Sequence, residues 1–285
     1  MSTERAAGSR LANAERQRGH VADVALADLT AAAKIADGGQ GRVFRLASPP
    51  GVLLKLYHRG VTVLPEELGR LIDLPGDRRD LGVAPVAWPV GRVFDDGRCV
   101  GSLVPEAPAE FATSLAGRRR LLELQFLLYP RRAMWADLVL PTDTERRGLA
   151  VAYVELFRVL HGNGVVVGDV SMRNLLWTLA TGPAVFAIDC DGFRLAGRPP
   201  AVRSVDTAGW TDPARPPEVT VDTDRYKLAL VALRVLLGNH EVTPEDVCRG
   251  AFPLDPELTA LARHAVRPGR RPPAECWLGA LGADL

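Results

Sequence analysis

The stretch from 168 to 193 contains GDVSMRN and, after a short spacer, FAIDCDGF. It places Asp169, Asn174 and Asp189 on two short segments, and each segment follows an apolar run, VVV or VFAI. Such runs of β-branched and aromatic residues are typical of strands. If these two strands pair, the three polar side chains meet at one end of them. Asp and Asn are also typical of simple turns, but two such segments at this spacing favour a site.

These residue types match what an ATP phosphotransferase needs. Such an enzyme uses a carboxylate that accepts or orients a hydroxyl proton, and it uses an amide and a second carboxylate to hold Mg²⁺ against the triphosphate. Asp169, Asn174 and Asp189 together supply two carboxylates and one amide of this kind.

The composition limits the class of protein. With 285 residues, 47% of them hydrophobic, the chain can form one large domain or two lobes. A net charge of +1 does not indicate a nucleic-acid or membrane partner. No apolar run reaches the roughly 18–20 residues that span a bilayer. The four cysteines lie far apart, which favours a reducing compartment over disulfides or zinc. We therefore expect a cytoplasmic protein.

The pattern changes along the chain. Residues 1–30 are rich in Ala and Arg and predict a tail or a frayed helix. Residues 31–107 contain short strand-like runs and one helix-like segment, PEELGRLIDL. From about Ser114 the pattern becomes helical, and the apolar stripes of GLAVAYVELFRVLHGNG and RYKLALVALRVLLG predict two strong helices. The sequence thus predicts an α+β protein whose second part covers residues 108–285, with a hinge near 104–109.

A glycine turn in KIADGGQGRVFRL predicts a phosphate-binding loop. Gly38, Gly39 and Gly41 remove side chains where the backbone must approach phosphate oxygens. Successive N–H groups can then point at an anion. Taken alone, the cluster is more typical of a plain hairpin turn, and it gains weight from Lys55 downstream.

Lys55 lies inside the apolar run GVLLKLY, downstream of the glycine turn. An ammonium buried there needs a partner, because an unpaired buried charge is costly. We expect ATP phosphates and a carboxylate of the next helix, Glu66 or Glu67, as partners. The alternative is a lysine that reaches water along an exposed strand face.

Taken in order, these segments resemble the protein-kinase superfamily. The likeness is greatest to atypical bacterial Ser/Thr kinases with GDxxxxN and DxDxF motifs, which often occur in stress or tellurium-resistance gene clusters. It runs from about Lys34 to Leu281. It implies a kinase-like fold of two lobes, with a small antiparallel sheet and one helix in residues 31–107 and a mainly helical lobe in residues 108–285. It also implies ATP and Mg²⁺ as cofactors.

The resemblance implies a role for each matching residue. Asp169, Lys55 and Asn174 are implied to be catalytic. Asn174 and Asp189 are implied to bind the metal, with Asp191 as the second choice. The residues implied to bind the nucleotide are Ala36, Gly38, Gly39, Gly41, Val43, Lys55, Glu66, Glu67, Val104 and Glu106. The resemblance also implies that Asp224 braces the catalytic loop, and that Arg271 pairs with Glu218.

The implied activity is transfer of the γ-phosphoryl group of ATP to a Ser or Thr hydroxyl of a protein substrate. Two alternatives stay open. A pseudokinase scaffold that acts on a regulatory partner is suggested by Val167 and Gly168, which stand where the family usually has a His-Arg pair. A small-molecule kinase of the aminoglycoside or choline type is suggested by the IDCD sequence at 188–191.

Overall fold

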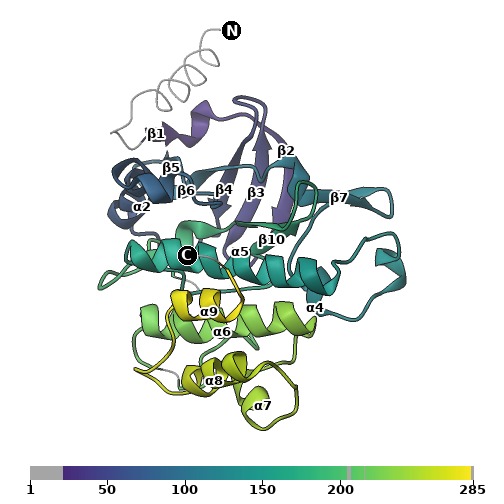
Figure 1. Ribbon diagram of the computed structural model, residues 1–285. Coiled ribbons are helices and arrows are strands. Elements are labelled where there is room, and N and C mark those ends of the chain that lie inside the picture. Colours follow the sequence, from purple (N-terminus) through teal and green to yellow (C-terminus); the bar gives the residue numbers. More distant parts are fainter. Residues whose placement is uncertain (1–21, 204–206, 215, 284–285) are drawn as a thin grey trace. The chain divides into compact units, whose positions relative to one another are not determined.

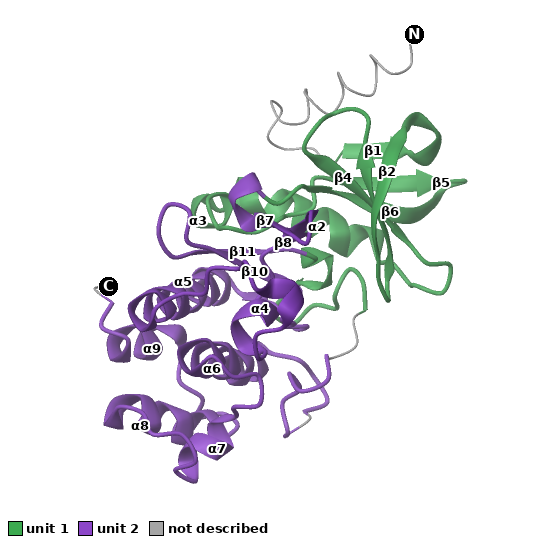
Figure 2. Ribbon diagram, turned by 90° about the vertical axis from the view of Figure 1, so that its right-hand side faces the viewer, with its two compact units in different colours: residues 1–107, 189–204 green, residues 108–188, 205–285 purple. Residues whose placement is uncertain are grey.

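The structure, a computed structural model (Figure 1), describes residues 22–203, 207–214 and 216–283. The chain divides into two compact units (Figure 2). Unit 1 comprises residues 1–107 and 189–204, and unit 2 comprises residues 108–188 and 205–285. Helices and strands occur in both, so the expected α+β class is confirmed.

A six-stranded sheet forms most of unit 1, in the order β1-β5-β6-β4-β3-β2. Neighbouring strands are antiparallel except β1 and β5, which are parallel. The sheet is therefore mixed, and the expectation of a purely antiparallel sheet is wrong at this edge. The strands are β1 (Ala22–Ala25), β2 (Ala31–Asp37), β3 (Gly41–Leu46), β4 (Val52–Tyr57), β5 (Gly91–Asp95) and β6 (Arg98–Pro105).

Strand β1 lies in the segment 1–30, for which we expected a tail or helix. Residues 1–21 lie outside the described residues, but from Ala22 onward the structure shows a strand and a short 3-10 helix, Leu26–Asp28. The reason is packing. Val24, Leu26 and Leu29 cover the buried core of the sheet, and removing apolar surface from water stabilises such an added edge.

The helix expected in PEELGRLIDL is confirmed as α2 (Pro65–Asp77). Pro65 occupies its first turn, where a missing N–H costs nothing, and the helix lies beside the sheet (Figure 1). A second short helix, α3 (Arg79–Gly82), follows. The described part of unit 1 therefore has two α-helices where one was expected. Strand β12 (Arg194–Leu195) belongs to the segment 189–204 of the same unit.

The two long helices expected in unit 2 are confirmed. They are α5 (Asp143–Gly162) and α6 (Val221–Leu237), which pack side by side (Figure 1). Each begins with a capping box, formed at the start of α5 by Thr142 and Glu145. Helix α6 is buried on nearly all sides and ends at Gly238, whose positive φ of 60° favours glycine. These helices provide the core against which the loops of unit 2 are fixed.

Residues 112–121 differ from expectation. We predicted helix from about Ser114, but β7 (Ala112–Leu115) and β8 (Arg118–Leu121) form an antiparallel hairpin. The turn residues Ala116 and Gly117 both have positive φ. This geometry is typical of the two-residue turn that joins twisted strands.

The predicted strand before Asp189 is confirmed as β11 (Ala184–Ala187), and β9 (Val165–Val166) covers the run before Gly168. The partner of β11 was not expected. It pairs with β10 (Leu175–Thr178), which begins directly after Asn174. The remaining helices of unit 2 are α4 (Gln125–Leu128), α7 (Pro244–Cys248), α8 (Pro256–Ala265) and α9 (Ala274–Ala280). Within the described residues, no helix combines the length and apolar character needed to cross a membrane.

Candidate active site

Four of the candidate nucleotide residues of unit 1 lie on one face of the sheet. In the strand register, Ala36 is opposite Val43, and Val43 is opposite Lys55. Residues that face each other across antiparallel strands point to the same side of the sheet. Val104 shares this side, because its partner Leu53 is two residues from Lys55 along β4. The structure therefore brings these four predicted residues to one surface.

The opposite face of the sheet is apolar. Its buried cluster comprises Leu46, Leu54, Val93 and Leu103. Lys55 follows Leu54 along β4, so its side chain points away from this core. The alternation explains why a lysine can lie in the run VLLKLY without entering the hydrophobic core.

The Lys55 ammonium is almost fully buried and is saturated by acceptors. It donates to Gln40 Oε1 at 2.9 Å, to Asp191 Oδ1 at 2.8 Å and to Asp189 Oδ1. A lysine has three N–H donors, and all three are used. Burial alone would lower the pKa of Lys55, but the charges of Asp191 and Asp189 and their hydrogen bonds raise it above its ordinary value.

The predicted partners of Lys55 on helix α2 are wrong in this structure. Glu67 accepts two hydrogen bonds from Arg198, one of them 2.8 Å long, and lies 3.6 Å from Arg70. These interactions lower the pKa of Glu67, with the hydrogen bond from Arg198 as the largest cause. Glu66 is not a partner of Lys55 either. Asp189 and Asp191 pair with Lys55, where we expected a carboxylate of α2.

Asp191 is held in a fixed environment. Its side chain is 1% exposed, and its second oxygen accepts a 2.6 Å hydrogen bond from the Tyr57 hydroxyl. Ser102 Oγ lies 3.1 Å from the same hydroxyl. Burial and the charge of Asp191 raise the pKa of Tyr57 well above its ordinary value. Both oxygens of Asp191 are thus engaged, so it suits an anchoring role better than metal binding.

Asp189 differs from Asp191 in exposure and backbone. Its side chain is 38% exposed, and its backbone is left-handed, with φ 61° and ψ 42°. This conformation is uncommon outside glycine, although Asp tolerates it better than most residues. Such positions cluster at ligand sites and switch regions. Of the two carboxylates, Asp189 is the one that can reach a ligand.

The glycine turn between β2 and β3 has two kinds of glycine. A side chain at Gly41 would come 2.4 Å from the backbone oxygen of Leu56, so close approach of β3 and β4 requires glycine there. A side-chain carbon added at Gly39 would meet no atom within 4 Å, and one added at Gly38 would lie 3.8 Å from the nearest atom. The protein's own packing therefore explains Gly41 but does not demand Gly38 or Gly39.

The predicted hinge residues lie at the end of β6. The backbone N–H of Glu106 donates to Gly51 O at 2.8 Å. Its carboxylate accepts two hydrogen bonds from Arg45, at 2.6 and 3.2 Å. Glu106 is thus tied to the sheet through both backbone and side chain, and its role in nucleotide binding stays a prediction.

In unit 2, the candidate base Asp169 lies in the loop between β9 and β10. Its Oδ1 accepts the Thr207 hydroxyl at 2.9 Å and the Thr207 backbone N–H at 3.2 Å. A threonine hydroxyl therefore occupies the position in which a substrate hydroxyl would give up a proton to this carboxylate. A general base needs this hydrogen-bond distance.

Buried groups of helix α6 hold the backbone of this loop. The Asp224 carboxylate, fully buried, accepts the backbone N–H of Val167 at 2.5 Å and of Gly168 at 3.0 Å. The expectation that Asp224 braces the loop is confirmed. Lys227, one turn later and 1% exposed, donates to Gly168 O. This contact was not expected. A lysine inside the apolar run RYKLALVALRVLLG nevertheless indicates that its ammonium needs a buried partner.

Asn174 is fixed by the β10–β11 hairpin. The backbone N–H of Ile188 donates to the Asn174 carbonyl at 2.9 Å, next to the pair formed by Leu175 and Ala187. Asp189 is the next residue in the chain. The predicted link between the two metal-ligand candidates thus comes from β10 and β11, not from pairing of the runs VVV and VFAI.

Arg271 does not have the partner that we expected. It forms two hydrogen bonds with Asp212, at 2.6 and 2.8 Å, and both side chains are buried. Glu218 is exposed. Asp212 is the carboxylate that satisfies the buried guanidinium, since a charge of this kind needs a paired and hydrogen-bonded partner. The predicted pair of Arg271 with Glu218 is therefore wrong.

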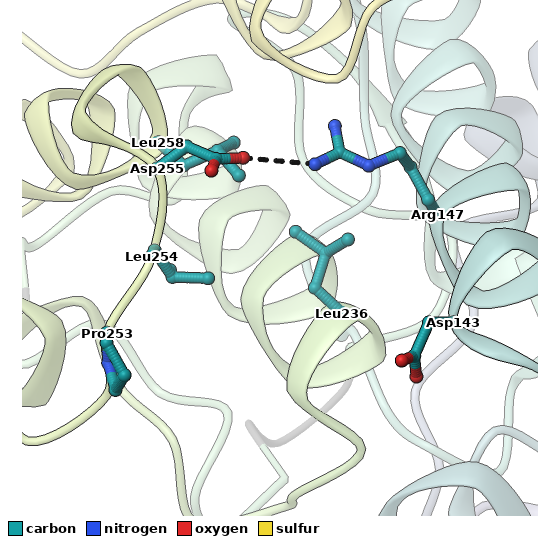
Figure 3. A pocket seen from close by; sticks show the side chains of 7 residues that line it. All are labelled: Asp143, Arg147, Leu236, Pro253, Leu254, Asp255 and Leu258. Carbon is teal, nitrogen blue, oxygen red and sulfur yellow. Dashed lines mark hydrogen bonds and ion pairs between the residues drawn. The ribbon is translucent and has the colours of Figure 1, made fainter.

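Two pockets of unit 2 are large enough for a small group. One, of about 380 Å³, is lined by residues of α5 and α6 and by the start of α8, with the side chains of Leu236, Leu254 and Leu258 and an Arg147–Asp255 ion pair around it (Figure 3). The other, of about 300 Å³, is lined in part by Thr207. Of these two, the second is lined by the residue that donates a hydrogen bond to the candidate base.

The side chains available for a metal can be compared with the needs of Mg²⁺. Mg²⁺ prefers oxygen ligands and usually takes one or two carboxylates, with phosphates and waters completing the shell. Asp189 supplies an accessible carboxylate, and Asn174 an amide oxygen. In the described part of the chain, no group of three or more His, Cys, Asp and Glu side chains is arranged to hold a metal by itself. The Asp189 and Asn174 side chains each carry the type of oxygen that Mg²⁺ prefers.

Comparison with known proteins gives no family for this chain. No family model matches it, and neither does any curated protein sequence.

Proposed function

We propose that the protein is an ATP- and Mg²⁺-dependent phosphotransferase that phosphorylates Ser or Thr hydroxyls of a protein. In this proposal units 1 and 2 are the two lobes of a kinase-like fold. The observation that carries it is the Lys55 cluster. A buried ammonium faces two carboxylates on the sheet side that also presents Ala36, Val43 and Val104.

Lys55 and Asp189 have the charges that a triphosphate requires. The ammonium lies next to Val43 in the cross-strand row that begins at Ala36, and there it can exchange a carboxylate partner for phosphate oxygens. Bound Mg²⁺ would neutralise charge on the phosphates, and Asp189 and Asn174 would hold it. Asp191 and Tyr57 keep the Lys55 cluster in place, because both side chains are buried and the Tyr57 hydroxyl donates a hydrogen bond to Asp191.

Asp169 accepts the proton of the acceptor hydroxyl. The acceptor hydroxyl oxygen forms a bond to the γ-phosphorus while the bond from that phosphorus to the β-phosphate oxygen breaks. ADP leaves with the electron pair, and the hydroxyl proton passes to Asp169. The Thr207 hydroxyl, 2.9 Å from Asp169, has the geometry of such an acceptor. Asp224 and Lys227 hold the loop, so positioning contributes to the rate.

Transfer of label from γ-labelled ATP to a mixture of protein acceptors tests the proposal. We expect Asp169→Asn to lower the rate by about 10²- to 10⁴-fold, the contribution of a general base. Its affinity for Mg·ATP, measured by calorimetry, should stay within about threefold, since Asp169 contacts the acceptor and not the nucleotide. Asp255→Asn is the control, because its carboxylate is exposed in the same unit.

Two results would contradict this assignment. Unchanged transfer by Asp169→Asn would remove the proposed base. Absence of Mg·ATP binding by the wild-type protein would remove the activity itself.

The saturated Lys55 gives specific support to a second candidate, the pseudokinase scaffold. Its three donors are all occupied by the protein's own acceptors. A scaffold would retain this cluster as a structural element. Mg·ATP binding without any turnover would favour the scaffold over the enzyme.

A further inference from the structure

The pocket of about 300 Å³ in unit 2 is one residue away from the candidate base, because Thr207 lines it and contacts Asp169. Its wall includes Thr207, whose hydroxyl donates to Asp169, and residues of the loop that follows Asp169. A group bound in this pocket would therefore lie next to the hydroxyl position at the base. The wall also contains aromatic and basic side chains, namely Tyr129, Arg132, Trp135 and Arg173.

Two arginines give this pocket a positive charge. Its lining residues include Arg132 and Arg173 but no Asp or Glu within the described parts of the chain. Neither arginine forms an ion pair with a described residue. Burial raises the pKa of Glu123 more strongly than the charge of Arg173 lowers that pKa. The pocket wall formed by the described residues thus carries two guanidinium groups and no carboxylate.

The Arg132 guanidinium is held over aromatic rings. It lies 5.2 Å from the centre of the Trp135 ring and 6.0 Å from that of Tyr129. Tyr129 in turn stacks on His240, and Trp135 packs edge-on against Phe126. A guanidinium stacked on rings keeps its N–H edge available for a carboxylate. The aromatic support holds the arginine before any ligand arrives.

We infer that this pocket binds acidic residues of a protein acceptor beside the hydroxyl that is to be phosphorylated. The inference rests on the proposed function and names its substrate class. A planar carboxylate can take two parallel hydrogen bonds from a guanidinium. Two arginines about the same cavity select for Asp or Glu near the acceptor Ser or Thr. They disfavour Lys and Arg there, because like charges repel.

Binding and transfer can be measured separately with three peptides. Each contains one serine, flanked by glutamates, by glutamines or by lysines. We expect the glutamate peptide to bind at least tenfold more tightly than the glutamine peptide, with binding weakened by salt because the contact is ionic. Binding is followed by Trp135 fluorescence, and the change should disappear in Trp135→Phe. The rate of phosphate transfer should follow the same order.

Arg132→Gln and Arg173→Gln test the assignment to this pocket. Each should bring the ratio of glutamate to glutamine peptide affinities close to one. Arg270→Gln removes an exposed arginine elsewhere in unit 2 and should leave that ratio unchanged. Circular dichroism and urea midpoints establish that each variant folds.

The outcomes separate this inference from the proposed function. Transfer to serine peptides without any preference for glutamate would overturn the pocket assignment and leave the phosphotransferase standing. Glutamate-specific binding that depends on Arg132, without transfer, would support the pocket and contradict the enzyme. A preference for phosphorylated sugars over the glutamate peptide would overturn the assignment to a protein acceptor.

Discussion

The Lys55 cluster of unit 1 and the Asp169 loop of unit 2 are stabilised in different ways. In the cluster, the candidate functional side chains bind one another, and Lys55 donates to the carboxylates of both Asp189 and Asp191. In the loop, the backbone is held from behind by Asp224 and Lys227. The Asp169 side chain accepts hydrogen bonds from the hydroxyl and the backbone N–H of Thr207, which are neutral groups.

This difference predicts how each region responds to substitution. Removing one charge from the cluster leaves a buried charge of opposite sign, so stability and ligand binding change together. Removing a side chain that supports the loop frees backbone groups, so the loop should lose its shape while the cluster is unaffected. We expect the largest loss of stability in the cluster and the smallest at the Glu67–Arg198 ion pair, whose arginine is 39% exposed.

Lys55→Met should be the most destabilising single substitution of the cluster or the loop. It leaves Asp191, 1% exposed, without its cation, and breaking a buried ion pair costs about 3–5 kcal/mol. The free energy of unfolding, measured in urea, should fall by that amount. The double variant Lys55→Met/Asp191→Asn should recover much of it, since the carboxylate that then remains, Asp189, is 38% exposed and hydrated. Lys34→Met, at an exposed position, is the control.

The stability difference between wild type and Lys55→Met should depend on pH. The pKa of Lys55 is raised in the folded protein, so the folded state holds its proton more tightly than the unfolded chain. The stabilising contribution is complete below the unfolded pKa of about 10.4 and is lost as pH rises toward the folded pKa. The stability difference between wild type and Lys55→Met should therefore be larger at about pH 8 than at about pH 11. A difference that grows with pH would contradict the ion pair.

Asp224→Ala should have the next largest effect. It removes the acceptor of two buried backbone N–H groups, and each unsatisfied group costs about 1–3 kcal/mol. We expect the unfolding free energy to fall by about 3 kcal/mol, and phosphate transfer to fall even where the protein remains folded. Mg·ATP affinity should change less than transfer. Glu241→Ala, at an exposed position, should change neither.

Tyr57→Phe should have a smaller effect confined to unit 1. It removes one hydrogen bond to the Asp191 carboxylate, and such a bond to a charged group contributes about 1.5–3 kcal/mol. The unfolding free energy should fall by that amount. In an Asp191→Asn background the loss should be smaller. Equal losses in both backgrounds would show that the hydroxyl acts through another group.

Glu67→Gln should have the smallest effect. Its partner Arg198 is 39% exposed, and solvent screens such pairs. The pKa of Glu67 is lowered, so its contribution is present above the unfolded pKa of about 4.3 and is lost as pH falls below it. Urea midpoints of wild type and variant should therefore converge on acidification. Loss of Mg·ATP affinity in Glu67→Gln would instead support a pairing of this residue with Lys55.

Much of the local structure could be predicted because the periodicity of apolar residues and the capping of helices depend on residues close together in the sequence. Helices α2, α5 and α6 follow from their apolar stripes and end signals. The hairpin at 112–121 was missed because its two positive-φ turn residues include Ala116, an unusual residue for that conformation. Strand β1 was missed because its stability comes from the distant core of the sheet.

The sequence predicted which residues form the candidate site better than it predicted their hydrogen-bond and ion-pair partners. Lys55, Asp169, Asn174 and Asp189 were singled out by type and position. Their partners depend on which segments the fold brings together, so Gln40, Lys227 and Asp212 could not be assigned as partners from spacing. Lys55 shows this most clearly, because it pairs with Asp191 and not with the expected Glu66 or Glu67. Any of these carboxylates could satisfy a buried ammonium, and only the tertiary structure decides among them.

The most direct test of the central proposal is mass spectrometry of the protein and an added serine acceptor after incubation with Mg·ATP. We predict phosphoryl groups on the acceptor with the wild-type protein, and none with Asp169→Asn or with Mg²⁺ removed by chelation. Phosphorylation that persists in Asp169→Asn, or no phosphorylation by a wild-type protein that binds Mg·ATP, would contradict the proposed phosphotransferase.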